Sequence, residues 1–67
     1  MENTQQRGRY TFAQVDLGKW LWAIVRDYVG PQEFGDVVCV FDAEHTPPPE
    51  VVQTLLQGAD ANDWREV

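Results

Sequence analysis

The sequence predicts an α+β fold in which one or two short strands pack against two helices. Two amphipathic stretches, residues 17–29 and 48–57, predict the helices, and an uninterrupted apolar run within residues 36–42 predicts a strand. The chain has 67 residues, a length that suits one small domain. We assign that domain to residues 9–67 and expect residues 1–8, which carry no apolar pattern, to fray.

Residues 9–14 fit two interpretations. Tyr10 and Phe12 alternate with polar neighbours, as in a short strand. Thr11 followed by Gln14 also fits a capping box, which would begin a helix instead. The strand is favoured. If this segment is helical, the fold is dominated by helices and has one exposed edge strand.

The clearest predicted helix covers residues 17–29, whose apolar side chains fall on one arc at about 100° per residue. Asp16 is placed to cap its first turn, and Gly30 followed by Pro31 ends it. The arc is formed by Leu17, Leu21, Ile24 and Tyr28.

Trp22 lies about 120° from the centre of that arc, on the face that also carries Lys19 and Arg26, whereas Trp20 lies nearer the core. The three side chains of that outer face can form a small cationic and aromatic patch. They can also form an ordinary solvated face in which aliphatic stems shield the indole. Because an exposed Trp is typical of a contact with another chain, Trp22 is a candidate partner-binding residue.

Residues 36–42 read DVVCVFD, five apolar residues bounded by acids, so both faces of the predicted strand should be covered. The helices can cover one face, and a second subunit, the aromatic N-terminal segment or Trp64 can cover the other. Proline is tolerated in a first helical turn, so residues 48–57 predict a second helix with Gly58 as its C-cap. Its apolar stripe is formed by Val51, Val52, Leu55 and Leu56.

Residues suited to catalysis or cofactor binding are scarce. The chain contains no Ser, and its only thiol and imidazole, Cys39 and His45, lack an activating setting such as a helix N-terminus. Asp42, Glu44 and His45 could share a divalent ion, but no second His and no Cys pair supports such a site. None of the glycines belongs to a phosphate-binding motif. We therefore expect no enzyme, no bound metal and no cofactor.

The apolar and cysteine content predicts a cytoplasmic protein without a membrane partner. No stretch approaches the roughly 18 uninterrupted apolar residues of a membrane span. Residues 1–9 lack the apolar core of a signal peptide. A single Cys cannot form an internal disulfide, which suits a reducing compartment.

The charge is strongly asymmetric, and it bears on the partner. The net charge is -6; residues 1–26 carry four Lys or Arg and two acids, whereas residues 27–67 carry nine acids and one Arg. Such a balance disfavours direct nucleic-acid binding, because phosphate contacts require cations. Carboxylates spaced along one face, such as Asp42 and Glu44 about 6.6 Å apart on a strand, can instead imitate phosphates and occupy a cationic groove. The candidate partner-binding residues are Asp36, Asp42, Glu44, Glu50, Asp60, Asp63 and Trp22.

In size and charge the chain is similar to the short acidic inhibitors that phages and mobile elements encode, including anti-CRISPR proteins and other DNA mimics. The resemblance covers no motif. It implies a non-enzymatic protein inhibitor that binds, through an acidic face, the basic nucleic-acid-binding surface of a host protein.

Two alternatives belong to other classes. One is a small homodimeric structural or accessory module, joined through the strand edge and Trp22 by apolar burial. The other is an antitoxin-like partner that folds fully only on binding.

Overall fold

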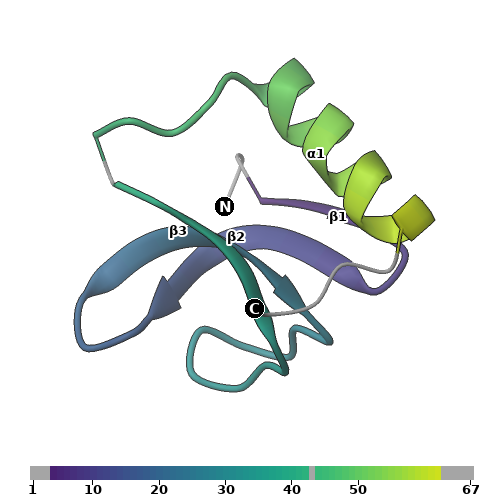
Figure 1. Cartoon of the computed structure of the whole chain (residues 1–67). Coiled ribbons are helices and arrows are strands. Elements are labelled where there is room, and N and C mark those ends of the chain that lie inside the picture. The colour runs from purple at the N-terminus through teal and green to yellow at the C-terminus, as the bar shows by residue number, and fades with distance from the viewer. Residues whose placement is uncertain (1–3, 43, 63–67) are drawn as a thin grey trace.

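The computed structural model describes residues 4–42 and 44–62, which form a four-stranded antiparallel sheet followed by one C-terminal helix (Figure 1). The sheet order is β1-β2-β3-β4, so each strand pairs with its neighbour in the sequence. The elements are β1 (Gln5–Arg7), β2 (Tyr10–Asp16), β3 (Trp20–Arg26), β4 (Val37–Phe41) and α1 (Pro49–Asn62).

The predicted fold class is wrong, because the helix expected over residues 17–29 is strand β3. On this strand Trp22 and Ile24 point to one face of the sheet, and Ala23 and Val25 point to the other. Most of these side chains are buried, so the segment shows no apolar–polar alternation, and its apolar positions also fit a helical arc. β-branched and aromatic residues favour the strand. The result is a sheet with one helix instead of short strands packed on two.

Asp16 does not cap a helix, because it ends β2 and supports the turn to β3. Its Oδ1 accepts a hydrogen bond from the Gly18 N–H at 3.1 Å, and Gly18 adopts a φ of 94° that few other residues tolerate. Gln32 donates to the other carboxylate oxygen at 2.8 Å, which ties the turn to the loop that follows β3.

The N-terminal half of the sheet is longer than expected. Residues 10–14 of the segment predicted as a strand lie in β2, which continues to Asp16, so the helical alternative is wrong. The expectation that residues 1–8 fray is also wrong for Gln5–Arg7, which form β1 and pair with β2 through a turn at Gly8. These three polar residues form an edge strand, which the backbone of β2 holds in place without an apolar pattern.

The C-terminal elements keep their predicted type with different bounds. β4 covers all but the two acids of the predicted strand, and a register shift opposite Ile24 and Val25 marks a bulge. Helix α1 begins after Pro48, whose carbonyl oxygen accepts the Val51 and Val52 N–H groups at 3.0 Å each. Gly58 lies inside α1 and is not its C-cap. The buried stripe runs through Val52, Leu56 and Ala59, so packing offsets the roughly 1 kcal/mol cost of a helical Gly.

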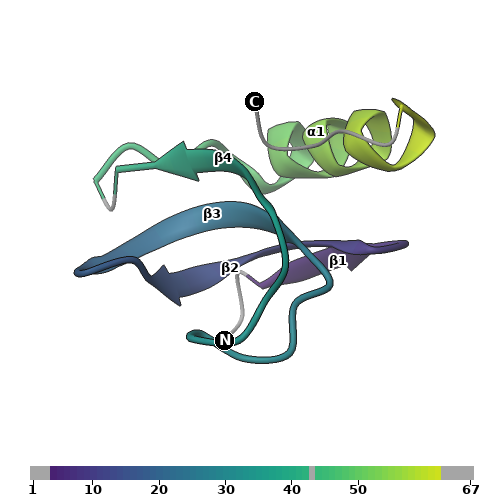
Figure 2. The same cartoon turned by 60° about the horizontal axis from the view of Figure 1, so that its bottom comes forward.

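Two layers cover the sheet. Helix α1 packs mainly against β1 and β2 on one face, and the loop of residues 27–36 crosses the other (Figure 2). The helix-side core joins Tyr10, Phe12, Ile24, Val52, Leu56 and Ala59. On the loop side, Tyr28 and Phe34 pack against a core of Val15, Ala23 and Val25. The Asp16 N–H donates to the Pro31 carbonyl at 2.9 Å and so anchors the loop to β2.

Within the described residues, no helix is long and apolar enough to cross a lipid bilayer.

Candidate functional site

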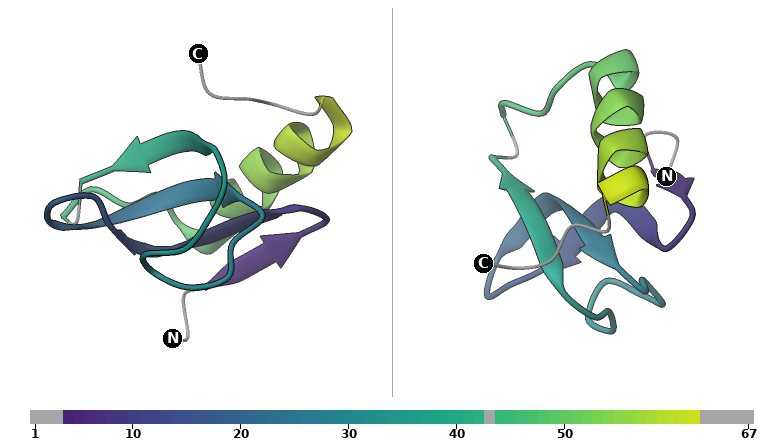
Figure 3. Two further views of the ribbon diagram at one scale, coloured as in Figure 1. Left: turned by 90° about the horizontal axis from the view of Figure 1, so that it is seen from below. Right: turned by 45° about the vertical axis from the view of Figure 1, so that its right-hand side comes forward.

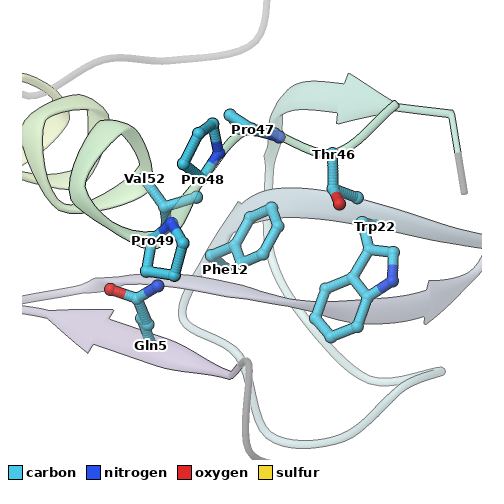
Figure 4. Close-up of a pocket in the computed structure, with 8 residues that line it drawn as sticks. All are labelled: Gln5, Phe12, Trp22, Thr46, Pro47, Pro48, Pro49 and Val52. Carbon is cyan, nitrogen blue, oxygen red and sulfur yellow. The ribbon is translucent and has the colours of Figure 1, made fainter. Parts of the chain in front are cut away.

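A groove of about 300 Å³ opens where the segment between β4 and α1 passes over the sheet (Figure 4). We call it the Trp22 groove. Its lining residues are Gln5, Phe12, Trp22, Thr46, Pro47, Pro48, Pro49 and Val52. The groove therefore combines residues from β1, β2, β3 and α1 with a wall of three consecutive prolines.

Stacked aromatic rings form the floor of the Trp22 groove. The rings of Phe12 and Trp22 lie nearly parallel, with centroids 4.9 Å apart and planes 17° from parallel. Phe41 meets Phe12 edge-on, with centroids 5.7 Å apart and an interplanar angle of 67°. Such a floor suits an apolar side chain, or the stem and cationic head of a Lys or Arg lying over a ring.

Trp22 lies in a different setting from the one predicted. It is half-buried, whereas Lys19 lies in the turn before β3 and the Arg26 side chain is buried at the other end of the strand. The predicted patch of Lys19, Trp22 and Arg26 therefore does not form. The more exposed indole is that of Trp20, which the sequence placed nearer the core and which is 53% exposed. Trp20 borders a shallow hollow of about 370 Å³ together with Asp42 and His45.

The structure brings two of the predicted acidic residues together. Asp42 and Glu44 lie just after β4 and border the same hollow, which Lys19 also lines without forming an ion pair with either acid. Glu50 lies in the first turn of α1, just beyond the proline wall, and is exposed. We call Asp42 and residues 44–50 the acidic segment. No Lys or Arg in the described ranges forms an ion pair with its three carboxylates; Asp42 has His45 Nδ1 at 3.8 Å.

The other predicted acids lie elsewhere. Asp36 precedes β4 and lies at the opposite end of that strand from Asp42, about 20 Å away if the strand is fully extended. Its Oδ2 is 3.7 Å from Arg26 Nη1. Asp60 is near the end of α1, about 15 Å along the helix from Glu50, and its carboxylate faces Gly8. Asp63 lies outside the described residues, as does Trp64. The predicted acids therefore do not share one face.

Cys39 and His45, the single thiol and imidazole of the chain, lie in different settings. Cys39 is half-buried in β4, and burial raises the pKa of its thiol, which disfavours the nucleophilic thiolate. His45 is exposed and faces Asp42. Across residues 4–42 and 44–62, no three His, Cys, Asp or Glu side chains are grouped so that they could hold a metal ion.

Several residues of the groove were not found from the sequence. Phe12, Pro47–Pro49 and Val52 belong to segments far apart in the chain, and only the antiparallel pairing of β2 with β3 and the return of α1 bring them together. The three prolines were visible in the sequence as a first-turn signal, but not as a wall.

Comparison with known proteins found no matching family model, no matching curated protein and no matching solved structure.

Proposed function

We propose that this chain is a non-enzymatic protein inhibitor that binds the basic nucleic-acid-binding surface of a host protein, as short acidic inhibitors of phages and mobile elements do. The observation that carries the proposal is the acidic segment: three exposed carboxylates, without a Lys or Arg partner in the described part of the chain, beside an aromatic groove. In this proposal the protein acts in the cytoplasm, with Cys39 as a reduced thiol.

Charge and preorganisation support this proposal. A cationic surface gains from Asp42, Glu44 and Glu50 without first displacing an internal Lys or Arg partner, and the net charge of -6 accelerates the encounter. Pro47–Pro49 restrict the backbone between the last two of these acids, so less conformational entropy is lost when the segment binds.

The Trp22 groove supplies an anchoring position beside the acids. A Lys or Arg of the partner can lay its aliphatic stem along Pro48 and its charged group over the indole of Trp22, with Glu50 one residue beyond the wall. Trp and Arg are frequent at the centres of protein interfaces. The groove therefore adds apolar burial to what would otherwise be a purely electrostatic contact.

The test begins with tagged protein used to capture partners from lysate of the organism that encodes the chain or of its host. The purified partner is then titrated with wild type, with the double variant Asp42→Lys/Glu44→Lys, and with the single charge-reversal control Asp60→Lys, at an acid away from the acidic segment. We expect binding that a duplex DNA of about 20 base pairs competes away. The double variant should weaken binding at least about tenfold, as loss of two charge contacts predicts, and Asp60→Lys should not.

Two outcomes would contradict the proposal. One is a captured partner without a nucleic-acid-binding surface, and the other is unchanged affinity in the double variant. Mass spectrometry of the partner before and after incubation with the protein tests the claim that inhibition is not enzymatic, because a covalent change in the partner would indicate catalysis.

A further inference from the structure

The outer edge of β4 is the second surface that the fold leaves open. β4 ends the sheet order, so among the described residues no strand pairs with its outer side. Helix α1 packs mainly over β1 and β2, and Figure 3 shows β4 on the side of the sheet away from the helix. Residues 37–41 contain no charge, no Pro and no Gly, although β4 is short and has the bulge described above.

Hydrogen-bond alternation identifies the free backbone groups. The backbone N–H of Arg26 donates to the Asp36 carbonyl oxygen at 2.8 Å, and the Arg26 carbonyl oxygen accepts the Gly35 N–H at 2.7 Å. The backbone polar groups of Arg26 therefore point toward β4 and not toward β2. Because this direction alternates along a strand, the backbone N–H and C=O groups of Ile24 and Trp22 also point toward β4. Those of their partners, Cys39 and Phe41, point back toward β3. Val40 lies between them and therefore directs its N–H and C=O outward. Its side chain is 49% exposed.

A second copy of the chain fits this edge poorly. An antiparallel two-fold pairing of β4 with itself, centred on Cys39, would place Asp36 of one copy opposite Asp42 of the other at both ends. Like charges directly opposite one another destabilise a strand pair. The same two acids attract an incoming strand that carries a cation at each end.

We propose that β4 binds an extended segment of the partner as a fifth strand, and that this segment has apolar or β-branched residues flanked by Lys or Arg. The inference rests on the proposed function, because it assumes a basic partner. The side chains of Asp36 and Asp42 are 49% and 78% exposed; Asp36 is ion-paired with Arg26 at 3.7 Å, whereas Asp42 has no Lys or Arg partner among the described residues. The two acids lie at opposite ends of β4, so the flanking cations lie at the two ends of the incoming segment. Main-chain hydrogen bonds supply affinity, and the flanking charges supply selectivity.

A designed peptide tests the edge directly. The probe has five alternating threonine and valine residues with a lysine at each end, and its control has a glutamate at each end. We expect the lysine peptide to shift the backbone amide resonances of residues 37–41 in ¹⁵N-labelled protein and to slow exchange of the Val40 amide. The glutamate peptide should bind at least about tenfold more weakly. Equal binding of the two peptides, or absence of binding by both, would overturn the inference.

Substitution of Val40 separates this inference from the proposed function. Val40→Pro removes the outward N–H without removing a bond to β3, and Pro is tolerated at such an edge position; Val40→Thr is the matched control. We expect Val40→Pro to lose at least about 90% of its affinity for the captured partner and for the lysine peptide, with wild-type circular dichroism, and Val40→Thr to keep both.

The results distinguish the two claims. If Asp42→Lys/Glu44→Lys loses the partner but Val40→Pro keeps it, strand addition is wrong and the proposed function stands. If both variants bind normally, both claims fail. A wild-type dimer that Val40→Pro dissociates would identify a second copy as the occupant and would overturn the inference.

Discussion

At the scale of single residues, Asp27 shows how a charge can secure a costly backbone conformation. It follows β3 with a φ of 56°, in the left-handed region that disfavours residues other than Gly. Its carboxylate accepts hydrogen bonds from Arg9 Nε at 3.2 Å and from Arg9 Nη2 at 3.0 Å, and its N–H donates to the Arg9 carbonyl at 2.8 Å. These contacts close the end of the β2–β3 pair where the chain leaves the sheet.

The pKa of Asp27 predicts a pH-dependent contribution to stability. The hydrogen bond from Arg9 lowers this pKa below its ordinary value of 3.8. A lowered folded-state pKa stabilises the fold above the unfolded-state pKa, and this contribution is lost as pH falls through the folded-state value. We expect the difference in Tm between wild type and Asp27→Asn to persist at neutral pH and to shrink below about pH 4. Arg9→Gln should behave likewise; an Asp27→Asn variant with the wild-type pH profile would contradict this assignment.

Gly35 is required because a backbone atom occupies the space of a side chain. A Cβ at this position would lie 2.9 Å from the Arg26 carbonyl oxygen, which also accepts the Gly35 N–H at 2.7 Å. We expect Gly35→Ala to reduce the free energy of unfolding by about 1–3 kcal/mol in urea denaturation. Gly30→Ala, with open space around its Cβ, is the control and should be neutral or stabilising by up to about 1 kcal/mol. Equal effects at the two positions would refute this steric explanation.

At the scale of elements, α1 stabilises the fold through a narrow stripe. Val52, Leu56 and Ala59 are almost completely buried against the sheet, and the Gln53 amide also hydrogen bonds to Gln5 Oε1 of β1. The helix therefore holds the short, polar edge strand β1 as well as the core. One wall of the Trp22 groove is continuous with the first turn of α1, so the packing of the helix also positions that wall.

Truncation of Leu56 measures how much the packing of α1 contributes to the stability of the fold. Leu56→Ala should cost about 2–5 kcal/mol, a large share of the roughly 3–5 kcal/mol that the core of so small a domain supplies. Val51→Ala, on the exposed side of the same helix, should cost less than about 1 kcal/mol. Thermal unfolding followed by circular dichroism gives both values. Similar losses for the two variants would mean that α1 does not pack as described.

At the scale of the whole molecule, the distribution of charge determines what the open edge accepts. Asp36 and Asp42 bracket β4, so the apolar strand is repelled by a copy of itself and attracts basic segments. The acidic segment lies at one of these ends, and the Trp22 groove lies beside it. A basic partner lying along β4 would therefore meet both surfaces.

This arrangement predicts a monomer that charge removal converts to a dimer. Sedimentation equilibrium should give the 7.7 kDa mass of one chain for wild type at low salt. Asp42→Asn removes the repulsion at both ends of two paired β4 strands, because each Asp36 would lie opposite an Asp42, and it keeps the ion pair of Asp36 with the buried Arg26. This variant should sediment at about twice that mass, and high salt should shift wild type in the same direction. An Asp42→Asn variant that stays monomeric at millimolar concentration would show that these acids do not prevent strand pairing.

The sequence alone determined the type of two elements, α1 and β4, whose residues carry a clear apolar pattern or a residue that marks where the element begins or ends. The proline-led start of α1 and the apolar run of β4 were readable within a few residues, because local chemistry specifies them. Part of the candidate site was also singled out by residue type: Asp42, Glu44, Glu50 and Trp22. The neighbours of Trp22 in the groove were not, because contact between distant segments has no local signature.

Only the tertiary structure decided that residues 20–26 form a strand and that Gln5–Arg7 join the sheet. Helix α1 covers one face of the sheet at β3, and the loop of residues 27–36 covers the other. Because side chains on both faces are therefore apolar, the sequence of β3 does not alternate between apolar and polar residues, and its hydrophobic pattern cannot distinguish a strand from a helix. The sequence of β1 gave no indication of a strand, because its side chains show no apolar pattern, yet its backbone pairs with β2. Periodicity records which faces meet water, and residues remote in the sequence determine which faces those are.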